Sequence, residues 1–313
     1  MTQYRPKPVP PSGSKPAGQG YTNSNYQRVQ TAPRKQKRSL GCFSPGCLIL
    51  LAVPILVLLA AYLLAPMRIN ILLMGIDRPP EGTNTSRTDT MILFSVDPLK
   101  PTIGMVSIPR DLWVQIPGVG ENRINTAHFF AEASNPGSGP QAAAQTVETN
   151  FGISVPYTIR LRFDGFVEVV DAMGGVDLNL DKPEGGLTAG EHHLNGTEAL
   201  AFARDRKGTD DFFRMADGQL MFKAVLKQML KVTNWPRLPY EIVKIFQAID
   251  TNIPAWQWPR LAVAFLRAGP GGIDNQVISR DMVQGYVTSG GADVLLPKWD
   301  LIRPFVHKIF GVN

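Results

Sequence analysis

Cysteine is nearly absent from this chain, because Cys42 and Cys47 are the only two among 313 residues. The long remainder after them can form no disulfide and offers no thiol nucleophile, which excludes cysteine-based catalysis there. Other catalytic signatures are lacking as well. The four histidines form no HExxH zinc motif, and the chain has neither a GxSxG nucleophile elbow nor a Gly-Lys-Ser/Thr phosphate loop. Zinc-protease, serine-hydrolase and P-loop NTPase functions therefore lack their motifs.

Acidic residues are missing from residues 1–40, which contain eight lysines and arginines. The formal net charge of the whole chain is +6, so subtracting these eight leaves −2 for the rest. The main part of the chain is therefore not a general polyanion binder, and we expect no nucleic acid partner. The N-terminal segment is rich in Pro, Gly, Ser, Gln and Asn, a composition typical of disorder.

The longest run without a charge is residues 47–67, CLILLAVPILVLLAAYLLAPM. About twenty apolar residues suffice to cross a hydrocarbon core of about 30 Å, so this run predicts one transmembrane helix. Several basic residues lie just before this run, and Arg68 alone follows it closely. Because basic residues favour the cytoplasmic side, this asymmetry predicts a disordered basic cytoplasmic tail over 1–46. It also predicts an extracytoplasmic catalytic domain over 68–313, held at the cell membrane. A cleaved signal peptide and a buried core helix are the alternatives.

Short apolar runs between turn formers predict strands in the remainder, and 3.6-residue periodicity predicts helices. The predicted strands are Ile69–Ile76, Met91–Val96, Ile103–Ile108, Tyr157–Leu161 and Val176–Leu180. The predicted helices cover residues 141–150, 164–173, 196–204, 212–232, 239–249 and 258–268, with Asp164 and Asn195 as N-caps. His192 and His193 are expected in a loop. This alternation predicts the α/β class, as an α-β-α sandwich around a mixed central sheet.

One carboxylate lies at the end of a predicted strand, and another lies at the start of the next strand. Asp77 ends the first strand, and Asp89 comes just before the second. Ligands collect at strand ends in α/β sheets, and Mg²⁺ needs only one or two carboxylates besides water and phosphate oxygens. The alternative interpretation is that Asp77 caps a turn and that Asp89 pairs with Arg87.

Arginines stand close to the same predicted elements. Arg110 follows the third strand, Arg204 and Arg206 end a helix, and Arg214 belongs to the next element. The planar guanidinium suits bidentate phosphate binding, so these arginines and the two carboxylates outline a pyrophosphate and metal site. For any one of them, a surface salt bridge is the alternative.

Six motifs in a fixed order are more specific than any single site residue. They are ILLMGID, SRTDTMILFSVD, MVSIPRDLWVQIPG, RINTAH, FDGFVEVVDAMGGVDLNL and HLNGTEALAFARDR. Together with the preceding apolar run, they resemble the LytR-CpsA-Psr family of cell-wall glycopolymer phosphotransferases. The resemblance is strong over residues 69–232, and VLLPKWDLIRPFV resembles the closing segment of the family.

This resemblance implies an α/β domain with an apolar pocket for a polyprenyl chain and a mouth that binds Mg²⁺ or Mn²⁺. It implies transfer of a phosphorylated glycan, such as teichoic acid or capsule, from a polyprenyl-pyrophosphate carrier to a hydroxyl of peptidoglycan. The implied metal ligands are Asp77 and Asp89. The implied phosphate ligands are Arg87, Arg110, Arg204, Arg206, Arg214 and Gln219. Asp89, Arg110, Arg204 and Arg206 are the predicted catalytic residues, and Asp89 is also the candidate general base.

One short segment of the sequence departs from the family pattern. An Arg-Gln pair is expected where this chain has Asp217 and Gly218, with Gln219 one position later. One hypothesis is that Gln219 takes the place of the expected Arg-Gln pair. The other is that this protein handles its substrate differently from other members of the family. The predicted lipid pocket consists of Phe163, Phe166, Phe202, Leu220 and Val225, although ordinary core packing would use the same residue types. A lipid pyrophosphatase and a non-enzymatic membrane regulator or lipid-binding scaffold are the rival functions.

Overall fold

The structure is a computed structural model that describes residues 45–63, 68–77, 81–205 and 211–311. The first helix, α1 (Pro45–Leu63), contains Pro54. Among the described residues, no helix is both long and apolar enough to cross a membrane. The predicted span over 47–67 stays a prediction, and its last four residues lie outside the described part of the chain, as does nearly all of the predicted tail.

A six-stranded mixed sheet forms the centre of the domain, in the strand order β10-β3-β2-β1-β6-β9. Its strands are β1 (Ile69–Ile76), β2 (Thr88–Val96), β3 (Ile103–Ser107), β6 (Tyr157–Arg162), β9 (Ile249–Thr251) and β10 (Ile273–Val277). The pairs β1–β6 and β3–β10 are parallel, whereas β1–β2, β2–β3 and β6–β9 are antiparallel. The predicted mixed sheet is confirmed.

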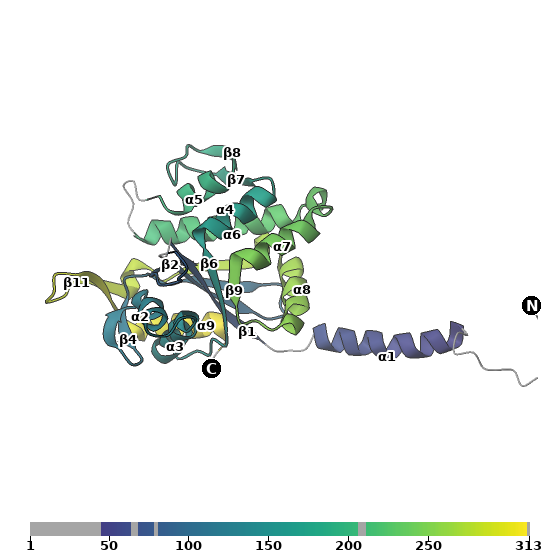
Figure 1. Ribbon diagram of the computed structural model, residues 1–313, viewed down its shortest axis with the longest axis horizontal. Coiled ribbons are helices and arrows are strands. Elements are labelled where there is room, and N and C mark those ends of the chain that lie inside the picture. Colours follow the sequence, from purple (N-terminus) through teal and green to yellow (C-terminus); the bar gives the residue numbers. More distant parts are fainter. Residues whose placement is uncertain (1–44, 64–67, 78–80, 206–210, 312–313) are drawn as a thin grey trace, which may run out of the picture. The chain divides into compact units, whose positions relative to one another are not determined.

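Helices cover both faces of this sheet (Figure 1). On one face lie α2 (Thr126–Ser134), α3 (Gly139–Phe151) and α9 (Trp299–Phe310), and on the other lie α6 (Asp211–Leu230) and α8 (Trp258–Ala268). Along β1, Leu72 and Met74 belong to the first core cluster and Ile71 to the second, because neighbouring side chains of a strand point to opposite faces. The result is the predicted α-β-α sandwich.

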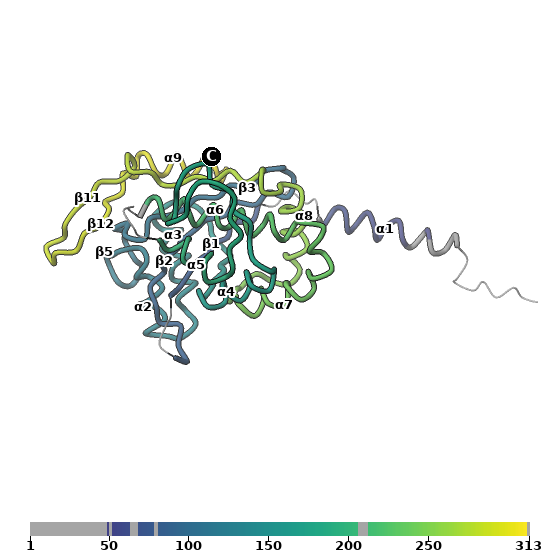
Figure 2. Tube along the Cα trace, turned by 90° about the horizontal axis from the view of Figure 1, so that it is seen from above, coloured from purple at the N-terminus to yellow at the C-terminus, as the bar shows by residue number. Residues whose placement is uncertain are grey.

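A third apolar cluster lies beyond the second face, among helices that lie above the sheet in Figure 1 and toward the viewer in Figure 2. It joins α6 to α4 (Phe163–Ala172), α5 (Gly196–Ala203), α7 (Leu238–Ala248) and the hairpin of β7 (Val176–Leu180) and β8 (Gly190–Leu194). Two more hairpins complete the domain, β4 (Trp113–Ile116) with β5 (Gly120–Arg123) and β11 (Val283–Val287) with β12 (Asp293–Pro297). Short 3₁₀ turns are η1 (Val232–Asn234), η2 (Ala255–Gln257), η3 (Pro270–Gly272) and η4 (Arg280–Met282).

Local signals at the element ends gave mixed results. Asn195 caps α5 as predicted, in a capping box with Glu198. The cap predicted at Asp164 is wrong, because β6 runs directly into α4, whose N-cap is Arg162. The loop predicted for His192 and His193 is wrong as well. Both lie on β8, which pairs with β7 although its sequence is polar.

Candidate functional site

The two candidate metal ligands lie at one end of the central sheet. Asp77 directly follows β1, and Asp89 is the second residue of β2. The strands are antiparallel neighbours, and Ile76 at the end of β1 is paired with Thr88 at the start of β2. Antiparallel pairing therefore brings together two acids that are twelve positions apart in the sequence.

Each of these carboxylates is paired with an arginine from a distant segment. Arg110 Nη1 lies 2.8 Å from Asp89 Oδ1. Arg204 binds Asp77 through two nitrogens, at 2.5 Å from Oδ2 and 3.3 Å from Oδ1. The alternative in which Asp89 pairs with Arg87 is wrong, since its partner is Arg110 and Arg87 is exposed. The sheet end is therefore a cluster of alternating charges.

A small polar depression, here called the polar mouth, opens beside the Asp89–Arg110 pair. Its lining comes from β2, β3, the residues after β3, and α6. The lining residues are Asp89, Thr90, Met91, Ser107, Ile108, Arg110, Arg214, Met215 and Gly218. Arg110 and Arg214 thus line one depression from different elements, and guanidinium groups suit the oxygens of an anion.

An apolar cavity of about 270 Å³ adjoins the polar mouth, since Thr90 and Gly218 line both. It lies between the second face of the sheet and the helices α4, α5, α6, α7 and α8. Its lining is Leu73, Gly75, Thr90, Ile92, Ile159, Leu161, Phe163, Phe166, Val169, Leu200, Ala203, Arg204, Gly218, Met221, Phe222, Val225, Met229, Ile245, Ile249 and Trp258. Among the described residues of this lining, Arg204 is the only charged one, so the other described walls suit a hydrocarbon chain.

The predicted pocket residues divide into two groups. Phe163, Phe166 and Val225 line the apolar cavity, whereas Phe202 and Leu220 do not. Phe202 is 2% exposed and packs in the third cluster, close under Gly185. Leu220 packs against the same cluster. On α6 it is turned about 100° from Met221, which does line the cavity.

One predicted phosphate ligand, Gln219, lies away from the polar mouth. Gln219 is 1% exposed, and its amide nitrogen donates to Ser107 Oγ at 2.9 Å and to the Gln276 carbonyl at 2.6 Å. It therefore ties α6 to β3 and β10 and does not line the polar mouth, so the hypothesis that it substitutes for the missing arginine is not supported by this geometry. Arg206 lies outside the described residues.

Asp217, where the family pattern has arginine, is almost fully buried, with 2% of its surface exposed. Burial, followed by the negative charge of Glu184 and a hydrogen bond with it, raises the pKa of Asp217 to about 7. Asp205 adds to the effect, and Lys182 opposes it. The position that should carry a permanent positive charge is instead a carboxyl group that is half protonated near neutrality.

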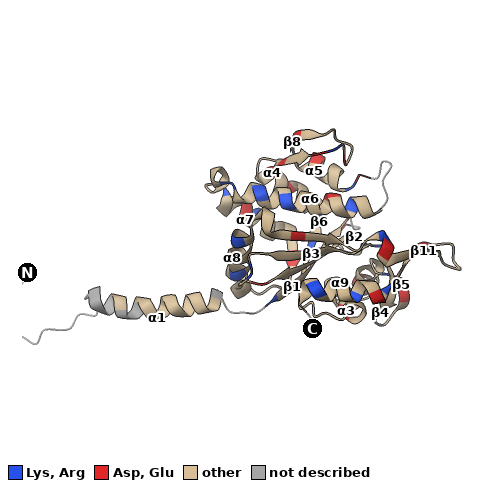
Figure 3. Cartoon of the chain, turned by 180° about the vertical axis from the view of Figure 1, so that it is seen from behind, with Lys and Arg blue, Asp and Glu red and all other residues tan. Residues whose placement is uncertain are grey.

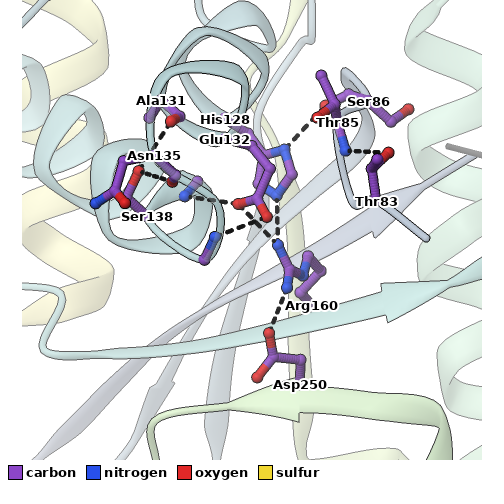
Figure 4. Close-up of polar contacts among 12 residues, drawn as sticks. Thr83, Thr85, Ser86, His128, Ala131, Glu132, Asn135, Ser138, Arg160 and Asp250 are labelled. Atoms are coloured by element: carbon purple, nitrogen blue, oxygen red, sulfur yellow. Dashed lines mark hydrogen bonds and ion pairs between the residues drawn. The ribbon is translucent and has the colours of Figure 1, made fainter. Parts of the chain in front are cut away.

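Behind the segment that leads into β2 lies a buried charge network (Figure 4). His128 contacts the Ser86 carbonyl through Nδ1 at 2.9 Å, and Arg160 Nη1 contacts His128 Nε2 at 3.2 Å. Arg160 also donates to Glu132 Oε2 at 3.1 Å and to Asp250 Oδ2 at 2.5 Å. Burial lowers the pKa of His128, so the neutral imidazole can donate from Nδ1 and accept at Nε2.

Glu132 completes this network. Burial raises its pKa, but hydrogen bonds from the backbone amides of Gly137 and Gly139, together with Arg160, outweigh burial and leave the pKa lowered. The network therefore fixes Ser86, which lies three residues before Asp89, to α2 and β6. Sequence reasoning missed it because its members are scattered along the chain and share no periodic pattern.

The donor set at the sheet end fits Mg²⁺ or Mn²⁺ better than a metal that needs a full protein cage. Within the described part of the chain, no three His, Cys, Asp or Glu side chains gather as a metal site. Asp77 and Asp89 provide two hard oxygen donors, and Mg²⁺ typically takes one or two carboxylates while water and phosphate oxygens fill its other positions.

Fold and site together define an α/β protein in which a mouth lined by arginines and carboxylates opens beside an apolar cavity. This arrangement suits a ligand with a polyanionic head and a long hydrocarbon tail. The sequence model of the LytR_cpsA_psr family matches residues 63–295. The chain belongs to this family.

Individual relatives support the assignment. Over 143 residues, the chain is 41% identical to the polyisoprenyl-teichoic acid–peptidoglycan teichoic acid transferase TagU of Oceanobacillus iheyensis, covering 44% of each chain. Over 195 residues it is 31% identical to the regulatory protein MsrR of Staphylococcus aureus, covering 60% of this chain and 57% of MsrR. The chain thus spans about half the length of these relatives. The crystal structure of B. subtilis TagV superposes with a TM-score of 0.64 at 26% identity, covering 79% of this chain and 99% of TagV.

Proposed function

We propose that this protein transfers a phosphorylated glycan from a polyprenyl-pyrophosphate carrier to a hydroxyl of the cell wall, with peptidoglycan as the acceptor. The observation that carries the proposal is the contact between the apolar cavity and the polar mouth through Thr90 and Gly218. A polyprenyl chain in the cavity would deliver its pyrophosphate to Arg110 and Arg214. The name of the related TagU describes the same kind of donor and acceptor, with teichoic acid as the glycan.

The proposed reaction is one phosphoryl transfer. The acceptor hydroxyl oxygen attacks the phosphorus next to the glycan, a new P–O bond forms, and the bond to the bridging pyrophosphate oxygen breaks. Polyprenyl phosphate leaves, and the hydroxyl proton passes to Asp89. Arg110, Arg204 and Arg214 orient the pyrophosphate and neutralise the charge on the leaving group, which is the main task of a protein in such transfers. Mg²⁺ or Mn²⁺ held by Asp77 and Asp89 would supply further neutralisation.

The proposed topology follows the sequence. Residues 47–67 anchor the chain in the cell membrane, the basic tail over 1–46 lies in the cytoplasm, and the domain over 68–313 lies outside, where the acceptor is. This arrangement is supported by the charge-free run and by the basic residues before it.

The test is to reconstitute the full chain in vesicles with a synthetic polyprenyl-pyrophosphate glycan, peptidoglycan fragments and Mg²⁺. Mass spectrometry should detect a glycan-phosphate adduct on the fragments that disappears with EDTA and in Arg110→Ala. Arg303→Ala is the matched control, because Arg303 lies exposed on α9 and binds the Asn150 carbonyl. Free phosphorylated glycan without adduct would show hydrolysis and contradict the proposal. Bound but intact carrier would identify a scaffold instead.

A further inference from the structure

Large apolar side chains are exposed on and just before α7. This set, here called the α7 surface, shares high exposure, between 44% and 70%. Its members are Val232, Trp235, Tyr240, Ile242, Val243 and Phe246. Side chains three and four positions apart share one side of a helix, so the four members on α7 form a continuous strip. Single exposed apolar residues are common, but such a group marks an interaction site.

The helix α7 carries apolar side chains on both of its sides, because Ile245 and Ala248 pack into the third core cluster. Its buried side holds Glu241, which is 1% exposed and whose carboxylate oxygens have no hydrogen-bond partner among the described residues. Tyr240 and Val243, by contrast, face outward and are about half exposed. A helix with apolar side chains on its outer side as well as on its inner side is suited to a second apolar phase outside the domain.

The wall behind the α7 surface is also a wall of the apolar cavity. Ile245 of α7, Ile249 of β9 and Trp258 of α8 line the cavity, and the Trp258 ring lies 4.9 Å from that of Phe246. The α7 surface is thus one helix away from the proposed site of the polyprenyl chain. A carrier lipid resides in the membrane, so a cavity wall with an apolar outer side favours the bilayer as the occupant.

The composition around the α7 surface also matches a membrane interface. Trp235 and Tyr240 are the residue types enriched at the level of lipid headgroups. Lys231, Arg237 and Lys244 lie in the same stretch of chain, where Lys231 pairs with Asp177 and Lys244 pairs with Glu168. Further basic residues are visible on α6 and α8 (Figure 3). Positive charge beside apolar side chains complements an anionic lipid surface.

The point at which the chain enters the domain agrees with this orientation. β1 begins at Ile69, immediately after the predicted membrane span over 47–67. Ile69 belongs to the same core cluster as Leu261 and Ala264 of α8. The described chain therefore enters the domain on the face of the sheet that α8 covers.

We propose that the α7 surface docks the domain onto the outer surface of the lipid bilayer, so that a carrier chain enters the apolar cavity directly from the membrane. The proposal rests on the proposed function for its lipid substrate. Its test does not depend on turnover.

The experiment places a fluorescent NBD probe at Val243→Cys in the full chain, with Cys42→Ser and Cys47→Ser, reconstituted in vesicles of phosphatidylglycerol and phosphatidylethanolamine. We expect quenching by doxyl-labelled lipids and protection from iodide. The control probe is Tyr286→Cys on β11, a half-exposed site far from α7 (Figure 1), which should show neither effect. Equal access of iodide to both probes overturns the proposal. Protection from iodide without quenching by lipid also overturns it and would indicate a protein partner.

A second arm connects docking to the reaction. Tyr240→Asp with Val243→Asp should lower transfer from a long-chain carrier in vesicles several-fold, and leave transfer from a short-chain, detergent-soluble donor unchanged. Tyr286→Asp is the matched control. Absence of transfer in every variant while the lipid quenching persists would contradict the proposed function alone, and docking would stand.

Discussion

The guanidinium of Arg204 lies 4.8 Å above the ring of Phe163, while the same guanidinium binds Asp77. Arg204 therefore stands at the boundary of the site, with a carboxylate on one side and the apolar cavity on the other. A headgroup that enters with its hydrocarbon chain in the cavity would meet this arginine first. A guanidinium can both stack on a ring and bind oxygens in a bidentate manner, and a lysine cannot.

Replacing Arg204 should separate these two roles. Arg204→Ala removes a phosphate donor and leaves Asp77 without its bidentate partner, so kcat/KM for transfer should fall about tenfold or more, equivalent to ~1.4 kcal/mol or more. Arg204→Lys keeps the charge and should recover only part of the loss. Equal activity of wild type and Arg204→Ala in steady-state transfer assays, with Arg303→Ala as control, would remove Arg204 from the proposed mechanism.

A larger side chain at Val225 should obstruct the apolar cavity. Val225→Phe adds a ring to the lining, so affinity for a long-chain carrier should fall several-fold while affinity for a short-chain analogue changes little. Leu220→Phe is the matched control on α6, because Leu220 packs against the third cluster and not on the cavity. Titration with both analogues in detergent measures the difference. Equal losses in the two variants would contradict the assignment of the cavity to the carrier chain.

Stability should depend on pH through Asp217. Its pKa is raised from 3.8 to about 7 by burial and by Glu184, so the folded state binds the proton more tightly than the unfolded state. The stabilisation that comes from the protonated carboxyl group of Asp217 is fully present at pH values below the pKa of this group in the unfolded state. It is lost as the pH rises through about 7, the pKa in the folded state.

Asp217→Asn should therefore stabilise the protein at about pH 8 and have little effect at about pH 4, because the wild-type side chain is neutral at the lower pH. Urea denaturation at both pH values measures the change. Asp293→Asn is the control, because Asp293 is exposed on β12. A variant that is equally stable relative to wild type at both pH values would show that Asp217 titrates normally.

The buried network around Arg160 should be costly to break. Arg160→Met leaves Glu132 buried without its counter-ion, so the free energy of unfolding should fall by about 3–5 kcal/mol. Glu132→Gln with Arg160→Met should recover part of this loss, because no unpaired buried charge remains. Urea denaturation measures both variants. A double mutant that is less stable than Arg160→Met would contradict the assignment of the cost to the unpaired carboxylate.

Predictions that depended on neighbouring residues succeeded in part, since the cap predicted at Asp164 is wrong. β1 begins and ends as predicted, and Asn195 caps α5 as expected, because alternation and capping are local patterns. Predictions about partners did less well. The alternative interpretation paired Asp89 with its sequence neighbour Arg87, whereas the fold supplies Arg110 from the segment after β3.

The sequence by itself determined the α/β class, the family and most of the strands and helices, since these depend on periodicity and on motifs of a few residues. Only the tertiary structure decided which side chains meet: that Phe163 and Val225 line the cavity while Phe202 does not, that Gln219 bonds to the sheet, and that His128 and Arg160 share a buried network. The physical reason is that side-chain contacts depend on strand pairing and helix rotation, which distant parts of the chain fix together.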